Sequence, residues 1–178
     1  MKKDASNEAF GKKEIDSMIQ FAIKNNLNPQ QGFIFNVGQH SGSYRFFLVD
    51  FDTRKVLVEG LCCHGSGSAT FDENPEISNV IGGNCSSVGF YKIGYKYNGK
   101  FGDAYKLYGL SPTNNNAFDR FVVLHAHDCV PEQSVPVSIC QSLGCPTLSP
   151  GIFKKIATYI DKSEKPMLLY LFKGKGVL

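Results

Sequence analysis

Two histidines and three cysteines fall within one segment, RFVVLHAHDCVPEQSVPVSICQSLGCPTLSPG, at positions 120–151. The thiolate form of cysteine is the nucleophile, and a neighbouring histidine can take the thiol proton near neutral pH. His125 ends the apolar run FVVLH, and Cys145 follows Gly144 in a short stretch between a loop and a helix. Backbone N–H groups around such a turn could stabilise an oxyanion. These positions make Cys145 a candidate nucleophile and His125 its candidate base, with a structural histidine and an inert buried thiol as the alternative.

Three further polar residues flank this pair. His127 lies two positions beyond His125 and points to the same face of an extended strand, so it is a second site residue or an alternative base. Arg120 could hold a peptide carboxylate in a bidentate pair or make a surface salt bridge. Ser142 could orient the histidine or the loop through its hydroxyl group. Each of these residues therefore has a structural interpretation beside the functional one.

A disulfide, a metal site and inert buried thiols are the alternatives to catalysis. Cys129 and Cys140 could form a bridge, whereas alternation along a strand would send the adjacent Cys62 and Cys63 to opposite faces. A zinc site would have to combine the ligand types of His64, His125, His127 and Cys145. Their spacing matches no familiar metal motif, and the sequence has no CxxC pair. We therefore expect no metal.

The composition narrows the class of protein. The chain has 178 residues, 42% of them hydrophobic, which suits one domain with its own core. The net charge of +3 comes from scattered basic residues, so nucleic acid is not an expected partner. No apolar run is long enough to span a membrane, and the opening MKK is followed by a polar stretch. The sequence is therefore that of a cytosolic protein or of an exported protein without its signal peptide.

Hydrophobic periodicity predicts a mainly β fold with two peripheral helices. Apolar residues at helical spacing predict a helix over 12–26, and Ser149 and Pro150 mark the start of a second helix that runs to about residue 161. Asn98-Gly99 is a two-residue hairpin signal. The region 62–87, rich in Gly, Ser and Asn, is expected to be a loop. The predicted strands lie at 32–37, 44–51, 55–59, 88–102, 104–110, 120–127 and 167–172.

The segment around His125 and Cys145 resembles the murein L,D-transpeptidase catalytic domain. That family's signature is a His, a spacer and then Ser/Thr-His-Gly-Cys, with Trp-Gly-Cys-Pro in one branch. Here sixteen residues, 126–141, separate His125 from Ser142-Leu143-Gly144-Cys145. The likeness continues through RFFLVDFDTRKVLVEGLCCHGSGSA, ISNVIGGNCSSVGFYKIGYKYNGKFGDAYKLYGL and NNNAFDRFVVLHAH, so it covers about residues 44–150.

The resemblance implies an L,D-transpeptidase-like β-sandwich or barrel and an enzyme that acts on peptidoglycan stem peptides without a cofactor. Cys145 would form a thioester with the stem, and His125, Gly144 and Ser142 would complete the catalytic group. Among the residues expected to contact substrate, the resemblance adds His64, at the border of the cleft; the full set is His64, His127, Arg120 and Leu143. A carboxypeptidase or other peptidoglycan hydrolase and a catalytically dead peptidoglycan-binding module remain the alternatives.

The same resemblance implies a place in the periplasm or cell envelope, with a signal peptide missing from this chain and a membrane tether as an option. We expect an N-terminal polar segment and helix over 1–30 and a catalytic domain over 31–178. Three departures from the family bear on substrate binding: Leu143 stands at the variable position, Gln141 replaces a frequent Arg, and Pro146-Thr147 replaces an apolar residue followed by Arg or Asn. How the substrate carboxylate is held is therefore open.

Overall fold

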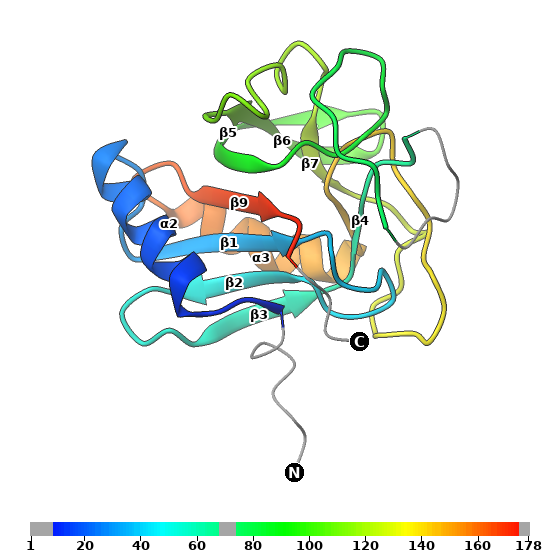
Figure 1. The fold of residues 1–178 in the computed structure, drawn as a ribbon. Helices are drawn as coiled ribbons and strands as arrows, with labels where there is room; N and C mark the ends of the chain where they lie inside the picture. The colour runs from blue at the N-terminus through cyan, green and yellow to red at the C-terminus, as the bar shows by residue number, and fades with distance from the viewer. Residues whose placement is uncertain (1–8, 68–73, 175–178) are drawn as a thin grey trace.

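The computed structural model describes residues 9–67 and 74–174. Within these residues nine strands form one sheet, in the order β3-β2-β1-β9-β5-β6-β7-β8-β4, with two helices outside it (Figure 1). The mainly β prediction with two peripheral helices is confirmed. The elements are α2 (Lys12–Lys24), β1 (Gln31–Asn36), β2 (Phe46–Asp50), β3 (Val56–Gly60), β4 (Cys62–Cys63), β5 (Gly89–Gly99), β6 (Gly102–Gly109), β7 (Val123–Ala126), β8 (Thr147–Leu148), α3 (Pro150–Lys162) and β9 (Leu168–Phe172).

Helix α2 covers the outer face of the strands β2, β1 and β9. Its apolar stripe of Ile15, Met18 and Ala22 is buried, as the helical spacing predicts. These side chains join a core cluster with residues that alternate along the strands, such as Ile34 and Val49. The helix is therefore packed on the sheet, while the predicted domain division at residue 30 stays a prediction.

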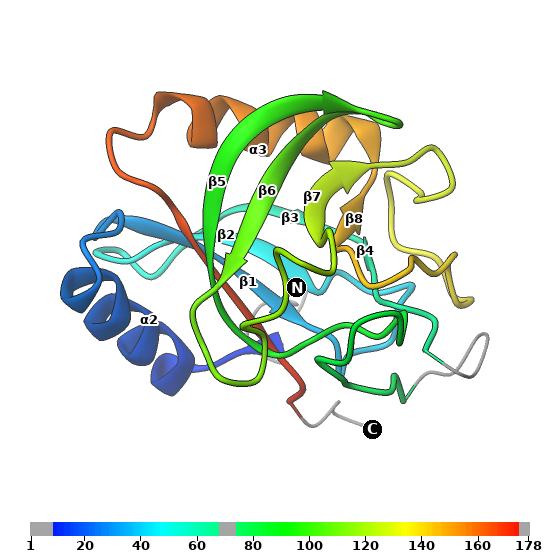
Figure 2. The same cartoon turned by 90° about the horizontal axis from the view of Figure 1, so that it is seen from above.

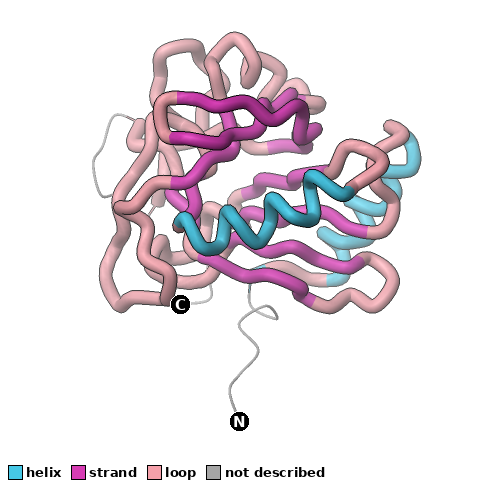
Figure 3. The backbone as a smooth tube through the Cα atoms, turned by 180° about the vertical axis from the view of Figure 1, so that it is seen from behind, coloured by secondary structure: helices cyan, strands magenta, loops and turns pink. Residues whose placement is uncertain are grey.

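Helix α3 lies on the opposite face of the same strands, as the view from behind shows (Figure 3). Ser149 caps it, because its Oγ accepts a hydrogen bond from the N–H of Ile152 at 3.4 Å. Ile152, Phe153 and Ile156 point into the main core. The sequence prediction of this helix and its cap is confirmed.

The sheet curls around the main core. The long strands β5 and β6 arch over α3, and β7, β8 and β4 continue the curve (Figure 2). The register of β5 against β6 shifts between Ile93 and Lys96, and such an irregularity bends and twists a strand pair. The curl brings the end of β7 beside β8 and β4, and this is where the candidate site lies.

The hairpin between β5 and β6 differs from the prediction. Asn98 pairs with Asp103 and Gly99 pairs with Gly102, so the loop consists of Lys100 and Phe101 rather than Asn98-Gly99. Gly102 takes a φ of +86°, which fits a turn followed by a glycine in the left-handed region. The prediction placed the turn two residues too early because it relied on the Asn-Gly pair alone. The shift matters because it puts Phe101 at the hairpin tip.

Two short strands at the sheet edge were missed by the sequence analysis. The β8 strand pairs in parallel with β7 and antiparallel with β4, which lies in the region predicted to be a loop. Each has only two residues, too few for a periodic signal. Among the described residues, no helix has both the length and the apolar character needed to cross a membrane.

Candidate active site

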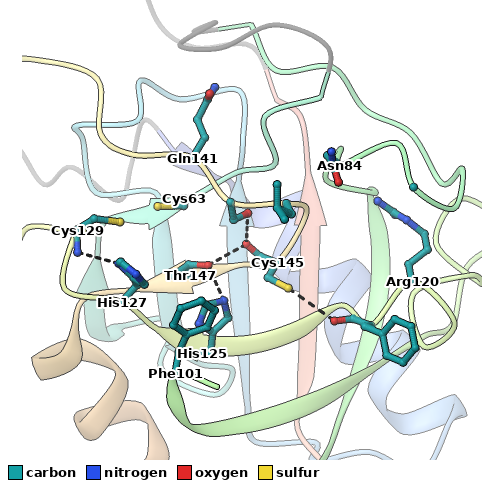
Figure 4. Close-up of a pocket in the computed structure, with 14 residues that line it drawn as sticks. Cys63, Asn84, Phe101, Arg120, His125, His127, Cys129, Gln141, Cys145 and Thr147 are labelled. Atoms are coloured by element: carbon teal, nitrogen blue, oxygen red, sulfur yellow. Dashed lines mark hydrogen bonds between the residues drawn. The ribbon is translucent and has the colours of Figure 1, made fainter. Parts of the chain in front are cut away.

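A cleft of about 480 Å³ opens at the edge formed by β7, β8 and β4. Its wall contains Cys145, His125, His127, Arg120 and Leu143, together with residues from the β5–β6 hairpin tip and the β4 strand (Figure 4). Most of the residues predicted as catalytic or substrate-binding therefore meet in one hollow. They come from segments far apart in the sequence, which the curled sheet brings together.

Cys145 is partly exposed in this cleft and is held by the chain that enters β7. Its Sγ accepts a hydrogen bond from the N–H of Val123 at 3.4 Å and lies 3.8 Å from the carbonyl oxygen of Phe121. Phe121 has a φ of +57°, a conformation rarely adopted by a residue with a side chain. This turn directs the Phe121 carbonyl group toward the thiol. Sequence reasoning gave no signal for Phe121.

His125 sits at the end of β7 with both ring nitrogens engaged. Its Nδ1 lies 3.0 Å from the carbonyl oxygen of Ala126, so Nδ1 carries the proton in the neutral ring. Its Nε2 then carries no proton and is the basic nitrogen of the ring; it lies 3.1 Å from Thr147 Oγ1. In the described part of the chain no direct hydrogen bond joins His125 to the Cys145 sulfur.

Thr147 links the two proposed catalytic residues. Its hydroxyl oxygen lies 3.1 Å from His125 Nε2 and 3.2 Å from the carbonyl oxygen of Cys145. A hydroxyl has one proton, so Thr147 donates either to the neutral imidazole or to that carbonyl group. In the second arrangement its oxygen can accept a hydrogen bond from the Nε2–H of a charged imidazole. Thr147 was seen in the sequence only as a departure from the family pattern.

Burial keeps both candidate catalytic groups neutral at rest. Desolvation raises the pKa of the Cys145 thiol above its usual 9.0, against smaller lowering effects of the Val123 N–H, Arg120 and Lys106. Desolvation also lowers the pKa of His125 below its usual 6.5, a shift that the Ala126 carbonyl opposes. The site at neutral pH is therefore a thiol beside an uncharged imidazole.

The turn before Cys145 is stabilised by Ser142. Its hydroxyl donates to the carbonyl oxygen of Cys145 at 2.7 Å and accepts from the N–H of Gly144 at 3.2 Å. Gly144 has a φ of +115°, and a side chain there would lie 2.8 Å from the carbonyl oxygen of Cys85. Ser142 thus orders the loop and does not contact His125, and Gly144 has a steric reason to be glycine. Leu143, at the tip of the turn, is 74% exposed.

Phe101 covers the histidines from the hairpin tip. Its ring stacks on His125 at a centroid distance of 5.3 Å and meets His127 edge-on at 5.2 Å. The two histidines thus face the same side, as the strand period indicated. The Nδ1 of His127 accepts a hydrogen bond from the N–H of Cys129, whereas His125 is the one connected to Thr147. This arrangement favours His125 over His127 as the base of Cys145.

Arg120 lines the cleft, but its guanidinium group holds a neighbouring loop. It donates to the carbonyl oxygens of Ser78 and Cys85 and to Ser87 Oγ. These contacts support a structural role for Arg120, but within the described residues they are hydrogen bonds to a loop and not the surface salt bridge named in the sequence analysis. A carboxylate contact stays a prediction, since the side chain borders the same hollow as Cys145.

His64 does not lie in the cleft wall. The side chain is 3% exposed, and its Nδ1 lies 2.8 Å from the guanidinium group of the fully buried Arg45. Its Nε2 lies 3.2 Å from the amide of Gln141, a residue that does line the cleft. The His64 carbonyl also accepts the N–H of Ser142. His64 therefore lies behind the wall, where it supports the loop that carries Cys145, and the expected direct contact with substrate has no support in this geometry.

The cysteines divide between the two sides of β4. Cys62 points into the main core and Cys63 into a small cluster beside the cleft, as predicted. Cys129 and Cys140 form the anticipated disulfide. In the described residues the group of side chains close enough to share a metal consists of Cys63, Cys129 and Cys140, not the histidines with Cys145.

Comparison with known proteins agrees with this architecture. A sequence model described as the L,D-transpeptidase catalytic domain matches residues 2–171. No curated protein sequence matches the chain. The structure of the helical cell shape determining protein Pgp2 from Campylobacter jejuni superposes with a TM-score of 0.51 at 14% identity, over 90% of this chain and 56% of that one. An L,D-transpeptidase from Mycobacterium smegmatis gives 0.46 at 13% identity, over 80% of this chain and 58% of that one.

The Pgp2 structure shares the fold. The chain spans little more than half the length of each of these two proteins. The family assignment rests on the match to the sequence model, which covers nearly the whole chain. The chain belongs to the L,D-transpeptidase catalytic domain family.

Proposed function

We propose that this protein is a cysteine-dependent L,D-transpeptidase that acts on the stem peptides of peptidoglycan. The observation that carries the proposal is the meeting of Cys145, His125 and the Gly144 turn in one cleft. A partly exposed thiol beside a neutral imidazole, with a constrained turn at the thiol, is the arrangement that acyl transfer requires. No metal or organic cofactor takes part in the scheme.

The sulfur of Cys145 attacks the carbonyl carbon of the third residue of a tetrapeptide stem. The thiol turns from the Phe121 carbonyl toward His125, whose Nε2 takes the proton while Nδ1–H stays on the Ala126 carbonyl. The resulting imidazolium returns this proton to the leaving amine of the terminal D-alanine. Since both groups are neutral at rest, proton transfer accompanies attack rather than preceding it.

The backbone around Cys145 stabilises the negative charge that develops on the substrate oxygen. The Gly144 N–H is engaged by Ser142, whereas the N–H of Cys145 has no acceptor within the described residues. The Cys145 N–H is therefore the first donor that we assign to the oxyanion. Ser142 positions this donor, because its hydroxyl binds the Gly144 N–H on one side of the Cys145 N–H and the Cys145 carbonyl oxygen on the other.

A second stem completes the reaction through its side-chain amine, which attacks the thioester and forms the cross-link. A smaller hollow of about 210 Å³, lined by Tyr97, Phe121 and Phe101, also reaches His125 and Cys145. Two hollows that share the nucleophile and its base leave room for a donor and an acceptor. An amine acceptor needs this room, whereas hydrolysis by water does not. Because peptidoglycan lies outside the cytoplasmic membrane, the proposed substrate implies that the protein acts in the periplasm or cell envelope.

Mass spectrometry of the protein with a carbapenem tests the proposal, because such drugs acylate the thiol of this family. We expect a stable adduct on the wild type, none on Cys145→Ala, and slower formation on His125→Ala. Incubation with disaccharide tetrapeptides then separates a cross-linked dimer from a tripeptide product of water. No adduct on fully reduced wild-type protein would refute the proposal in favour of a binding module.

A further inference from the structure

Three cysteine sulfurs gather beside the cleft, apart from the nucleophile. Cys129 and Cys140 form a disulfide, and the free Cys63 thiol lies 3.3 Å from Cys140 Sγ. All three sulfurs lie within 4.8 Å of one another. Contact between a thiol and a disulfide sulfur is the first requirement of thiol–disulfide exchange. The attacking and leaving sulfurs must also lie in line with the central one, so the Cys63 or Cys129 side chain has to rotate before the bond to Cys140 can exchange.

The three cysteines come from different parts of the fold. Cys63 is on β4, whose residues pair with β8, so it stands opposite Thr147 in the ladder. Cys129 and Cys140 close a loop with eleven residues of sequence separation after β7. Cys63 and Cys129 both line the cleft that holds Cys145. A bond from Cys140 to Cys63 would tie this loop to the sheet instead of to itself.

Exposure differs sharply across the group. Cys63 is 1% exposed, Cys140 is partly exposed and Cys129 is exposed. Burial raises the pKa of the Cys63 thiol to about 12, so this thiol attacks slowly at neutral pH. Exchange would place the buried sulfur in a disulfide and leave the exposed sulfur as a thiol.

We propose that Cys63, Cys129 and Cys140 form a thiol–disulfide exchange site, in which Cys140 pairs alternately with Cys129 and with Cys63. The Cys63 sulfur, as thiolate, attacks Cys140 Sγ; the Cys63–Cys140 bond forms and the Cys129–Cys140 bond breaks. The electron pair leaves on Cys129, which takes up the proton that Cys63 lost. The number of disulfides is unchanged, so the step needs no oxidant or reductant.

The product has a new thiol in the cleft. Cys129 then stands beside His127, whose Nδ1 accepts the Cys129 N–H at 3.1 Å, and is open to solvent-borne thiols or alkylating agents. The site is thus a place of covalent modification in the same hollow as Cys145. The inference does not depend on the reaction proposed for Cys145.

Trapping of the released Cys129 thiol in the wild-type protein tests the proposed exchange. The native protein without reductant is held at about pH 9 with iodoacetamide, quenched in acid and mapped as unreduced peptides. The exposed Cys129 thiol is alkylated whenever exchange releases it, whereas burial protects the Cys63 thiol from alkylation. Alkylation of Cys129 prevents the reverse reaction, so the Cys63–Cys140 product accumulates. We expect the Cys129–Cys140 peptide to disappear over time. A Cys63–Cys140 peptide and alkylated Cys129 should appear in its place, in equal amounts.

Three variants sharpen the result. Cys63→Ser should abolish the new crosslink, and Cys62→Ser, which alters the neighbouring thiol on the opposite face, should leave it unchanged. Cys145→Ala should still give it, which excludes attack by the cleft nucleophile. Persistence of the Cys129–Cys140 peptide alone in the wild type, with Cys63 free after unfolding, would overturn the proposal.

A second measurement uses Cys129→Ser with oxidised glutathione as the oxidant. Cys140 has then lost its partner, and we expect it to pair with Cys63 in the folded protein. Recovery of Cys63 and Cys140 as free or glutathionylated thiols would also overturn the proposal.

Discussion

Replacement of Thr147 by valine tests whether the hydroxyl group positions the proposed base. Valine keeps the shape of the side chain and removes its two polar contacts, with His125 Nε2 and with the Cys145 carbonyl oxygen. The imidazole would then keep its hydrogen bond to the Ala126 carbonyl and its contact with the Phe101 ring. We expect Nε2 to spend less time in the orientation needed for proton transfer.

The magnitude follows from the contacts that are lost. A neutral hydrogen bond contributes about 0.5–1.5 kcal/mol net, which corresponds to a roughly 2- to 13-fold slower acylation. Thr147 is 3% exposed and His125 is 8% exposed, so the lost partner also destabilises the fold. We expect Thr147→Val to lower the free energy of unfolding by about 1 kcal/mol. This is the low end for an unsatisfied buried group, because water can partly reach the His125 ring.

The assay is the second-order rate constant for acylation by a carbapenem, followed by intact-protein mass spectrometry, with urea unfolding alongside. Thr147→Ser is the matched control, because it keeps the hydroxyl, and its rate should lie near that of the wild type. Equal rates for Thr147→Val and the wild type would refute the positioning role. A faster rate would mean that Thr147 competes with the sulfur for Nε2.

Three further predictions follow from the geometry. Burial raises the pKa of Cys145 above 9.0 and lowers that of His125 below 6.5, so less than about 1% of Cys145 is thiolate at pH 7. The rate of Cys145 alkylation by iodoacetamide, followed by peptide mapping, should therefore keep rising above about pH 9. A plateau in this rate near neutral pH that His125→Ala removes would contradict the prediction. Gly144→Ala should abolish carbapenem acylation and destabilise the fold by about 1–3 kcal/mol in urea unfolding, because the new Cβ meets the Cys85 carbonyl at a positive φ; normal acylation would count against the turn as the oxyanion support. Ser149→Ala should cost about 1 kcal/mol of unfolding free energy through loss of the α3 cap while acylation is kept, and an unchanged urea midpoint would show that the cap adds no stability.

The sequence predicted the elements with long periodic patterns. Helix α3 and its Ser149 cap, and the apolar stripe of α2, are read from residues close together in the chain. The same holds for most strands, since alternation along a strand is local. The hairpin turn at Lys100-Phe101 was misplaced because its geometry depends on the pairing of β5 with β6, not on the Asn98-Gly99 pair.

The candidate site was predictable only in part. His125 and Cys145 are identified by their positions in the sequence motif, together with Gly144 and Ser142. The partners of these residues were not predictable. Phe101 reaches the histidines from a distant hairpin, and the place of His64 behind the cleft wall depends on the buried Arg45.

The sequence by itself determined the family, the mainly β class, the helix stripes and the two residues expected to carry the chemistry. Each of these depends on residue type and on spacing along the chain. The tertiary structure decided which ring nitrogen of His125 lacks a proton, how Thr147 joins this ring to the Cys145 loop, and that Cys63 contacts the Cys129–Cys140 disulfide. These contacts form only when the curled sheet brings β4, β7 and β8 to one edge, because strand pairing over long separations sets them.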